Sequence, residues 1–270
     1  MSPEANGSVL FPLQAGLLIA MLPSSFPLSS LERPARALVV GASGGIGSAV
    51  TDLLAGGGFE TIHALSRSGD HTGAPGIEAG TIDIEDEASI AAAAGPLAEG
   101  APLRFVLVAT GLLHDAALQP EKTYRALSPE HLARSFRINA IGPALVAKHM
   151  LPLLPKAGKS IFAVLSARVG SIEDNHLGGW YGYRASKAAL NQLVRTCAVE
   201  LKRQKPQAVC VALHPGTVDT ALSGPFQAGV ETAKLFSPAY AAGRLLDVVD
   251  ALTDADSGRL FAWDGQRIPF

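Results

Sequence analysis

The sequence predicts a single α/β domain in which helices cover both faces of a doubly wound, mainly parallel sheet of seven strands. From Arg36 onward, short β-branched and apolar runs alternate with longer segments of helical periodicity, a pattern typical of repeated βαβ units. The chain is 48% hydrophobic and 17% charged, which suits a sheet buried on both faces. No repeat or second composition regime interrupts the pattern, so we predict one domain over residues 36–270.

Each predicted strand is a short apolar run bounded by glycine, proline or polar residues. Ser128 and Pro129 suit the N-cap and the first turn of a long helix. The predicted strands lie within residues 37–40, 59–65, 77–84, 103–109, 159–165, 209–213 and 259–262, and the helices cover 46–55, 87–98, 129–154, 179–203 and 238–252.

Residues 1–35 differ from the rest of the chain. Their apolar segment, residues 9–22, is too short and too interrupted to span a bilayer. A secretory signal needs a basic region, whereas Glu4 is the only charged residue before Glu32. Met21 is an alternative start. We therefore expect a disordered or dispensable extension on a cytoplasmic protein.

Bulk charge and cysteine content favour small-molecule chemistry. The net charge of −2 gives no attraction to nucleic acid or to an anionic membrane, so we predict neither partner. Cys197 and Cys210 lie in apolar periodic segments, which indicates buried thiols, although a disulfide between them stays open. His114-Asp115 and His176 have no second ligand at a suitable spacing, so we predict no metal and take them as loop residues, with His176 a candidate for substrate contact.

A glycine-rich turn separates the first predicted strand from the first helix. Glycines there let the backbone turn sharply and approach a pyrophosphate at the helix N-terminus. A tight turn without a ligand is the alternative, but the position directly after the first strand favours a dinucleotide. The turn has the spacing G-x-x-x-G-x-G, formed by Gly41, Ala42, Ser43, Gly44, Gly45, Ile46 and Gly47.

The second predicted strand ends at Ser66 and Arg67. NAD-preferring domains usually carry an acidic residue at this position, where it binds the ribose hydroxyls. A guanidinium suits the 2′-phosphate of NADP(H) instead. We therefore predict NADP(H) as cofactor, with an ordinary solvated loop residue as the alternative role of Arg67.

Tyr183 and Lys187 stand four residues apart in a predicted helix, so their side chains share one face. A free tyrosine has a pKa near ~10, and a nearby cation lowers that value by favouring the phenolate. We expect Lys187 to have this effect on Tyr183. Tyr181 competes as the acid, but it lies six residues from Lys187 and points to another side of the helix.

Together with Ser166 at the end of a strand, these motifs resemble the short-chain dehydrogenase/reductase family from about Arg36 to the C-terminus. Residues 166–172, 178–181 and 263–265 resemble its C-factor group. The resemblance implies a Rossmann-type fold in which Ser166 hydrogen-bonds the substrate carbonyl, Tyr183 protonates its oxygen and Lys187 holds the nicotinamide ribose. Ser171 is a competing serine, but Ser166 directly ends the strand, where ligands of open α/β sheets bind.

The resemblance also implies a role for Asn139, whose backbone carbonyl holds a water near Lys187 in relatives. Pro143 supplies a physical reason, because a proline has no N–H to bond to the carbonyl four residues earlier. A proline that merely kinks a surface-facing helix is the alternative.

Further cofactor contacts follow from the resemblance. Asp83 and Ile84 would contact adenine, with a helix cap as the rival role of Asp83. The family usually has Asn-Asn-Ala-Gly after the fourth strand, whereas this chain has Ala109, Thr110 and Gly111. We expect Gly111 to keep the close approach to the cofactor and Thr110 to replace the missing asparagine. The segment that positions the nicotinamide contains Pro215, Gly216, Val218 and Thr220.

These features predict reversible hydride transfer between NADP(H) and a small carbonyl or alcohol, with Gly-, Ser- and Thr-rich residues 217–237 as a mobile substrate lid. A cofactor-binding signalling or regulatory protein of C-factor type is the alternative, and an epimerase or dehydratase is a weaker one. The resemblance implies a homodimer or homotetramer that pairs through helices 129–154 and 179–203.

Overall fold

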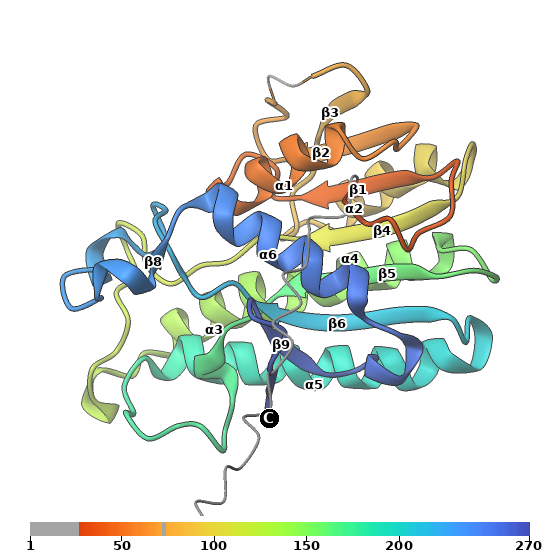
Figure 1. The fold of residues 1–270 in the computed structure, drawn as a ribbon. Helices are drawn as coiled ribbons and strands as arrows, with labels where there is room; N and C mark the ends of the chain where they lie inside the picture. Colours follow the sequence, from red (N-terminus) through yellow and green to blue (C-terminus); the bar gives the residue numbers. More distant parts are fainter. Residues whose placement is uncertain (1–26, 72–73) are drawn as a thin grey trace, which may run out of the picture.

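The computed structural model describes residues 27–71 and 74–270 (Figure 1). Within them, eight strands form one sheet in the order β10-β9-β6-β5-β4-β1-β2-β3. Seven strands are parallel, and β10 (Arg267–Ile268) pairs antiparallel with β9 at the edge. The predicted α/β class and the seven parallel strands are confirmed. Those strands are β1 (Arg36–Val40), β2 (Thr61–Ser66), β3 (Ile77–Thr81), β4 (Leu103–Val108), β5 (Ser160–Leu165), β6 (Ala208–His214) and β9 (Leu260–Ala262).

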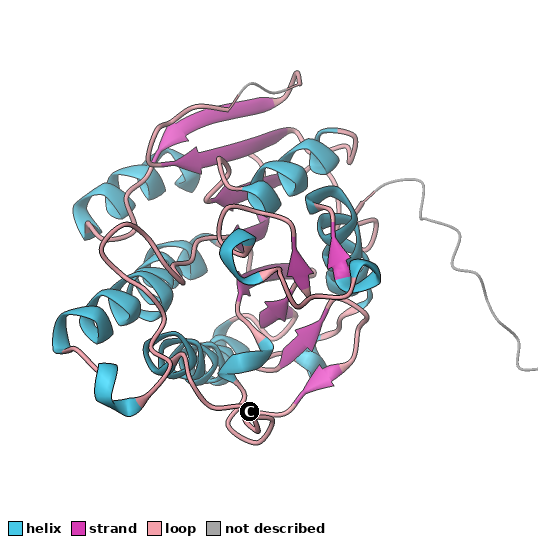
Figure 2. Cartoon of the chain, turned by 90° about the vertical axis from the view of Figure 1, so that its left-hand side faces the viewer, coloured by secondary structure: helices cyan, strands magenta, loops and turns pink. Residues whose placement is uncertain are grey.

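Helices cover both faces of the sheet (Figures 1 and 2). Alternate residues of each strand face opposite sides, so Val39 packs in one core cluster and Val40 in the other. The Val39 face is covered by α1 (Gly45–Ala55) and α6 (Pro238–Ala251). The Val40 face is covered by α2 (Glu87–Ala94), α4 (Gly142–Met150) and α5 (Tyr181–Gln204).

The long helix predicted over residues 129–154 is divided. It begins as α3 (Pro129–Phe136), with Ser128 accepting a hydrogen bond from the His131 amide as its N-cap. A π-helical turn (Arg137–Ile141) follows, and α4 continues from it. The Gly142 amide bonds to the Arg137 carbonyl, five residues back, and proline at position 143 has no N–H to restore the α pattern. The helix predicted over residues 129–154 is therefore present but divided, and the irregularity expected from Pro143 takes the form of a π-helical turn.

Strand order places the candidate site. The chain runs outward from β1 in two directions, through β2 and β3 on one side and through β4, β5 and β6 on the other. Ligands of such sheets bind outside the carboxyl ends of the strands, at the point where the order reverses. Beyond these ends, β7 (Thr217–Val218) pairs with β8 (Leu235–Phe236), and together they bound the expected lid.

Part of the expected N-terminal extension packs on the domain. The apolar segment 9–22, with the alternative start, lies outside the described residues. By contrast, Leu28 and Leu31 are buried in the core cluster on the α1 and α6 face. We therefore propose that the folded domain begins by residue 28.

Three further findings concern the described residues. Cys197 and Cys210 are free thiols. No helix in residues 27–71 and 74–270 combines the length and apolar composition that spanning a bilayer requires. The same ranges contain no group of three or more His, Cys, Asp or Glu side chains able to hold a metal ion.

Candidate active site

The glycine-rich turn between β1 and α1 has no room for a side chain at Gly41 or Gly47. A Cβ on Gly47 would lie 2.1 Å from the Gly41 carbonyl oxygen, and Gly41 itself has φ +90°. The N-terminus of α1 has no side-chain cap at Gly44 and no acidic residue in its first turn. Its amide groups and its dipole therefore remain able to bind an anion such as a pyrophosphate.

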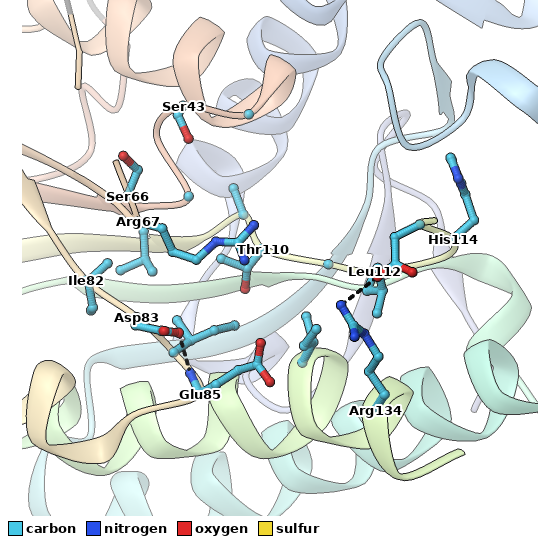
Figure 3. Close-up of a pocket in the computed structure, with 18 residues that line it drawn as sticks. Ser43, Ser66, Arg67, Ile82, Asp83, Glu85, Thr110, Leu112, His114 and Arg134 are labelled. Carbon is cyan, nitrogen blue, oxygen red and sulfur yellow. Dashed lines mark hydrogen bonds and ion pairs between the residues drawn. The ribbon is translucent and has the colours of Figure 1, made fainter. Parts of the chain in front are cut away.

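A cleft lies beside this turn, at the carboxyl ends of β1, β2 and β4 (Figure 3). The hydroxyl of Thr110 is buried there without a hydrogen-bond partner, so the cleft has a polar atom to offer a nucleotide. The same observation corrects an expectation, because Thr110 makes none of the side-chain bonds expected in place of the family's asparagine. Predicted cofactor residues that line the cleft are Gly41, Ser43, Gly44, Ser66, Arg67, Asp83, Ile84, Ala109, Thr110 and Gly111.

Arg67 is exposed and extends from the end of β2 into the cleft, toward Thr110 (Figure 3). Ser66 is buried beside it, and its hydroxyl accepts a hydrogen bond from the Gly69 amide at 3.1 Å. Ser66 therefore holds the turn that presents Arg67. The guanidinium is the group of this pair that can reach a phosphate.

Asp83 is not the cap of the following helix. That cap is Asp86, which accepts a hydrogen bond from the Ala88 amide at 2.9 Å. Asp83 lines the cleft and accepts from the Glu85 amide with one carboxylate oxygen, Oδ1. Its second oxygen has no partner among the hydrogen bonds of the described residues, which suits an amine donor such as adenine.

Ser166, Tyr183 and Lys187 line one cavity, which shares lining residues with this cleft and with a second pocket. Lys187 is buried, and its Nζ donates to the Leu165 carbonyl at 2.8 Å and lies 5.9 Å from the centre of the Tyr183 ring. The competing tyrosine, Tyr181, is exposed and lines neither cavity nor pocket. Other predicted residues around the cavity or the pocket are Gly45, Ile46, Pro215, Gly216, Val218 and Thr220.

The pKa values of the pair differ from the expectation. Burial raises the pKa of Tyr183 to about 12, whereas we expected Lys187 to lower it. Burial also lowers the pKa of Lys187 to about 7. A lysine that is only partly protonated at neutral pH gives its neighbour little cationic field, and desolvation of the phenolate dominates.

The side chain of Asn139 joins two elements of the candidate site. It is fully buried in the π-helical turn, and its amide accepts from the Leu112 amide and donates to the Leu112 carbonyl, each at 2.8 Å. It also donates to the Ser186 hydroxyl at 3.1 Å. The side chain thus joins the loop after β4 to α5, between Tyr183 and Lys187.

The second pocket is mostly apolar and lies under the segment after β6. The ring of Trp180 meets the ring of Phe226 edge-on, with centroids 5.1 Å apart, and Tyr183 at 6.3 Å. His114 is a half-buried loop residue that packs on Phe226, with its Nε2 3.1 Å from the Ala221 carbonyl oxygen. Phe226 belongs to the segment expected as a substrate lid, whereas Trp180 was not expected to line the pocket, although it stands one turn before Tyr183.

Other predicted residues lie elsewhere or are already engaged. Ser171 is buried in a local turn and accepts from the Asp174 amide. His176 is exposed and does not line the pocket. The Val218 carbonyl, expected to face the nicotinamide, accepts a hydrogen bond from the Ser223 hydroxyl. The Thr220 methyl packs over Gly45, where a Cβ would lie 2.8 Å from it.

Comparison with known proteins agrees with this geometry. A family model described as short chain dehydrogenase matches residues 35–231. The chain is 41% identical over 140 residues to C-signal of Myxococcus xanthus, covering 52% of this chain and 78% of that protein. It is 33% identical over 231 residues to 1-hydroxy-2-glutathionyl-2-methyl-3-butene dehydrogenase of Rhodococcus sp. (strain AD45), covering 84% and 96%.

A solved structure, NADPH-bound carbonyl reductase from chicken fatty liver, matches with a TM-score of 0.75 and 26% identity, covering 90% of this chain and 97% of that one. The family match covers most of the chain and includes the glycine turn, Tyr183 and Lys187. The protein belongs to the short-chain dehydrogenase family.

Proposed function

We propose that the protein is an NADP(H)-dependent oxidoreductase that interconverts a small carbonyl compound and its alcohol. One observation carries the proposal: Ser166, Tyr183 and Lys187 line a single cavity that shares Gly44 and residues 109–111 with the glycine-lined cleft. The dehydrogenase from Rhodococcus, which aligns over 84% of this chain, supports the reaction class.

When bound, the cofactor supplies or accepts the hydride. Tyr183 donates its phenol proton to the carbonyl oxygen, and Ser166 hydrogen-bonds the same oxygen. With a pKa of about 12, the phenol is protonated throughout the neutral range, which is the form that a general acid for carbonyl reduction needs. Lys187 would hold the ribose hydroxyls, which its place in the lining of the cavity supports. Asn139 keeps α5 against the loop after β4.

The choice of NADP(H) over NAD(H) depends on Arg67. Its guanidinium extends into the cleft at the end of β2 and can bind a 2′-phosphate. An acidic residue at this position, as in NAD-preferring domains, would repel that phosphate. The carbonyl reductase from chicken liver is described as NADPH bound, which supports the same assignment.

The test is oxidation of NADPH and NADH, followed at 340 nm, with 4-nitrobenzaldehyde, acetophenone and menadione as carbonyl probes. We expect net oxidation with a preference for NADPH of at least about tenfold in kcat/KM, from one charge-assisted phosphate contact. Tyr183→Phe should abolish turnover while NADPH still binds, and Arg67→Ala should remove the coenzyme preference. Higher efficiency with NADH, or full activity of Tyr183→Phe, would refute the proposal.

The second candidate is a cofactor-binding signalling protein, which the 41% identity to C-signal favours. Such a protein would need the cleft but not a buried lysine beside a tyrosine. NADPH binding without turnover of any probe would support the signalling protein. Turnover of a substrate without net consumption of NADPH would instead indicate an epimerase or dehydratase. We also propose a cytoplasmic homodimer or homotetramer, to be tested by sedimentation.

A further inference from the structure

The helix α5 carries a third polar residue in line with Tyr183 and Lys187. Asn191 follows Lys187 by four residues and Tyr183 by eight, so all three lie on the same face. Its side chain is 2% exposed. A buried amide needs partners, and those partners show what it does.

The Ser166 hydroxyl donates its hydrogen bond to Asn191 Oδ1, with 2.7 Å between the oxygens. Both residues are buried, so water does not compete for this bond. A serine hydroxyl has one proton and two lone pairs. While that proton is bonded to Asn191, Ser166 offers the substrate pocket its lone pairs.

The orientation of the Asn191 amide is set by its other partner. Its Nδ2 donates to the Gly170 carbonyl at 3.3 Å. A flipped amide would bring two acceptor oxygens together at Gly170, so the network places Oδ1 toward Ser166. Gly170 packs directly against α5, because a Cβ on it would lie 2.8 Å from the Lys187 Cβ, so no larger residue fits there.

We propose that Asn191 is a positioning residue that fixes the Ser166 hydroxyl and sets its hydrogen-bond polarity. The inference rests on the proposed function. Ser166 receives a donor from the pocket, such as an alcohol or the Tyr183 phenol, while bonded to Asn191. When the Ser166 hydroxyl rotates, its proton turns from Asn191 Oδ1 toward the pocket, and Ser166 then donates to a carbonyl oxygen. Held in this way, the Ser166 oxygen stays fixed beside the pocket, and only a rotation of its O–H bond is needed to direct the proton to the reacting oxygen.

The test is a double-mutant cycle on the carbonyl probe with the highest kcat/KM in the panel above. Asn191→Leu removes both amide bonds at similar volume, and we expect kcat to fall about tenfold with KM within about twofold, as one lost hydrogen bond implies. Ser166→Ala should lower kcat about 10²-fold. Because Asn191 acts through Ser166, Asn191→Leu should cause no further loss when Ser166 is already alanine.

Two further variants of α5 serve as controls for the cycle. Gln192→Leu removes an exposed amide from the adjacent position and should leave kcat unchanged. Asn191→Asp should return kcat to within about threefold of the wild type, because burial favours a protonated carboxyl that can repeat both bonds of the amide. It also serves if the leucine variant fails to fold.

The outcomes separate the two levels of the argument. Losses that multiply in the double variant, or an aspartate variant as slow as the leucine variant, overturn the role of Asn191 and leave the proposed function intact. Wild-type kcat in Ser166→Ala removes the proposed role of the serine, and the inference falls with it.

Discussion

At the scale of single residues, the site contains a buried lysine, Lys187, whose charged ammonium group is poorly solvated. Lys187 is buried, its Nζ has a carbonyl as partner, and no carboxylate pairs with it in the described chain. Desolvation of the charged form is therefore not repaid by an opposite charge. This cost makes Lys187 a source of pH-dependent instability as well as a functional group.

We predict that Lys187→Met raises the free energy of unfolding, and that the gain is larger at pH 7 than at pH 9.5. The folded-state pKa is about 7, against ~10.4 for an unfolded lysine. Between these values the unfolded chain binds a proton that the folded chain lacks, so wild-type stability rises with pH by up to ~1.4 kcal/mol per unit. Urea denaturation of both proteins at the two pH values, without cofactor, measures the difference. A gain independent of pH would contradict the assignment.

Single residues also show what sequence spacing can predict. Tyr183, Lys187 and Ser166 were found because helical spacing and a strand end are local features of the sequence. Asn191 was missed, because its partner lies 25 positions away and only the packing of α5 on β5 brings them together. The predicted direction of the Tyr183 pKa shift was wrong for a similar reason, because the burial that raises this pKa cannot be read from sequence spacing.

At the scale of elements, the π-helical turn between α3 and α4 positions Asn139. We predict that Pro143→Ala lowers kcat about tenfold, because an added N–H lets the α pattern continue and shifts the buried amide from its Leu112 bonds. The pH-rate profile should change as well. Steady-state kinetics across pH, together with circular dichroism, measure this effect.

Pro129→Ala is the matched control. It changes a proline at the first turn of α3, where no N–H bond is required, so kinetics should match the wild type. If Pro143→Ala behaved like this control, the π-helical turn would have no role in the reaction.

The same elements mark the limit of sequence patterns. The sequence pattern predicted all seven parallel strands because each is a short apolar run or is bounded by glycine, proline or polar residues. It missed β7, β8 and β10, since two-residue strands contain no period. It missed the π-helical turn because one additional residue in a turn changes hydrogen bonding without changing which residues are apolar.

At the scale of the whole molecule, residues 27–35 tie the amino-terminal end of the strands to α6. The Asp250 carboxylate accepts hydrogen bonds from the Ser29 and Ser30 amides at 3.1 and 2.8 Å. Glu32 pairs with Arg104, whose guanidinium is nearly buried. All these contacts lie at the end of the sheet opposite the site, so this segment bears on stability and not on chemistry.

We predict that a chain of residues 27–270 unfolds at the same temperature as the full chain, whereas a chain of residues 36–270 is destabilised. The shorter chain exposes the sites of Leu28 and Leu31, each worth ~1.5–3 kcal/mol of burial, and leaves Arg104 without its carboxylate. Leu31→Ala should reproduce part of the loss, and Leu177→Ala, at a side chain 92% exposed, should not. Thermal unfolding followed by circular dichroism compares these four variants with the full chain. Equal midpoints for the two truncated chains would place the start of the folded domain at residue 36, because residues 27–35 would then add nothing to its stability.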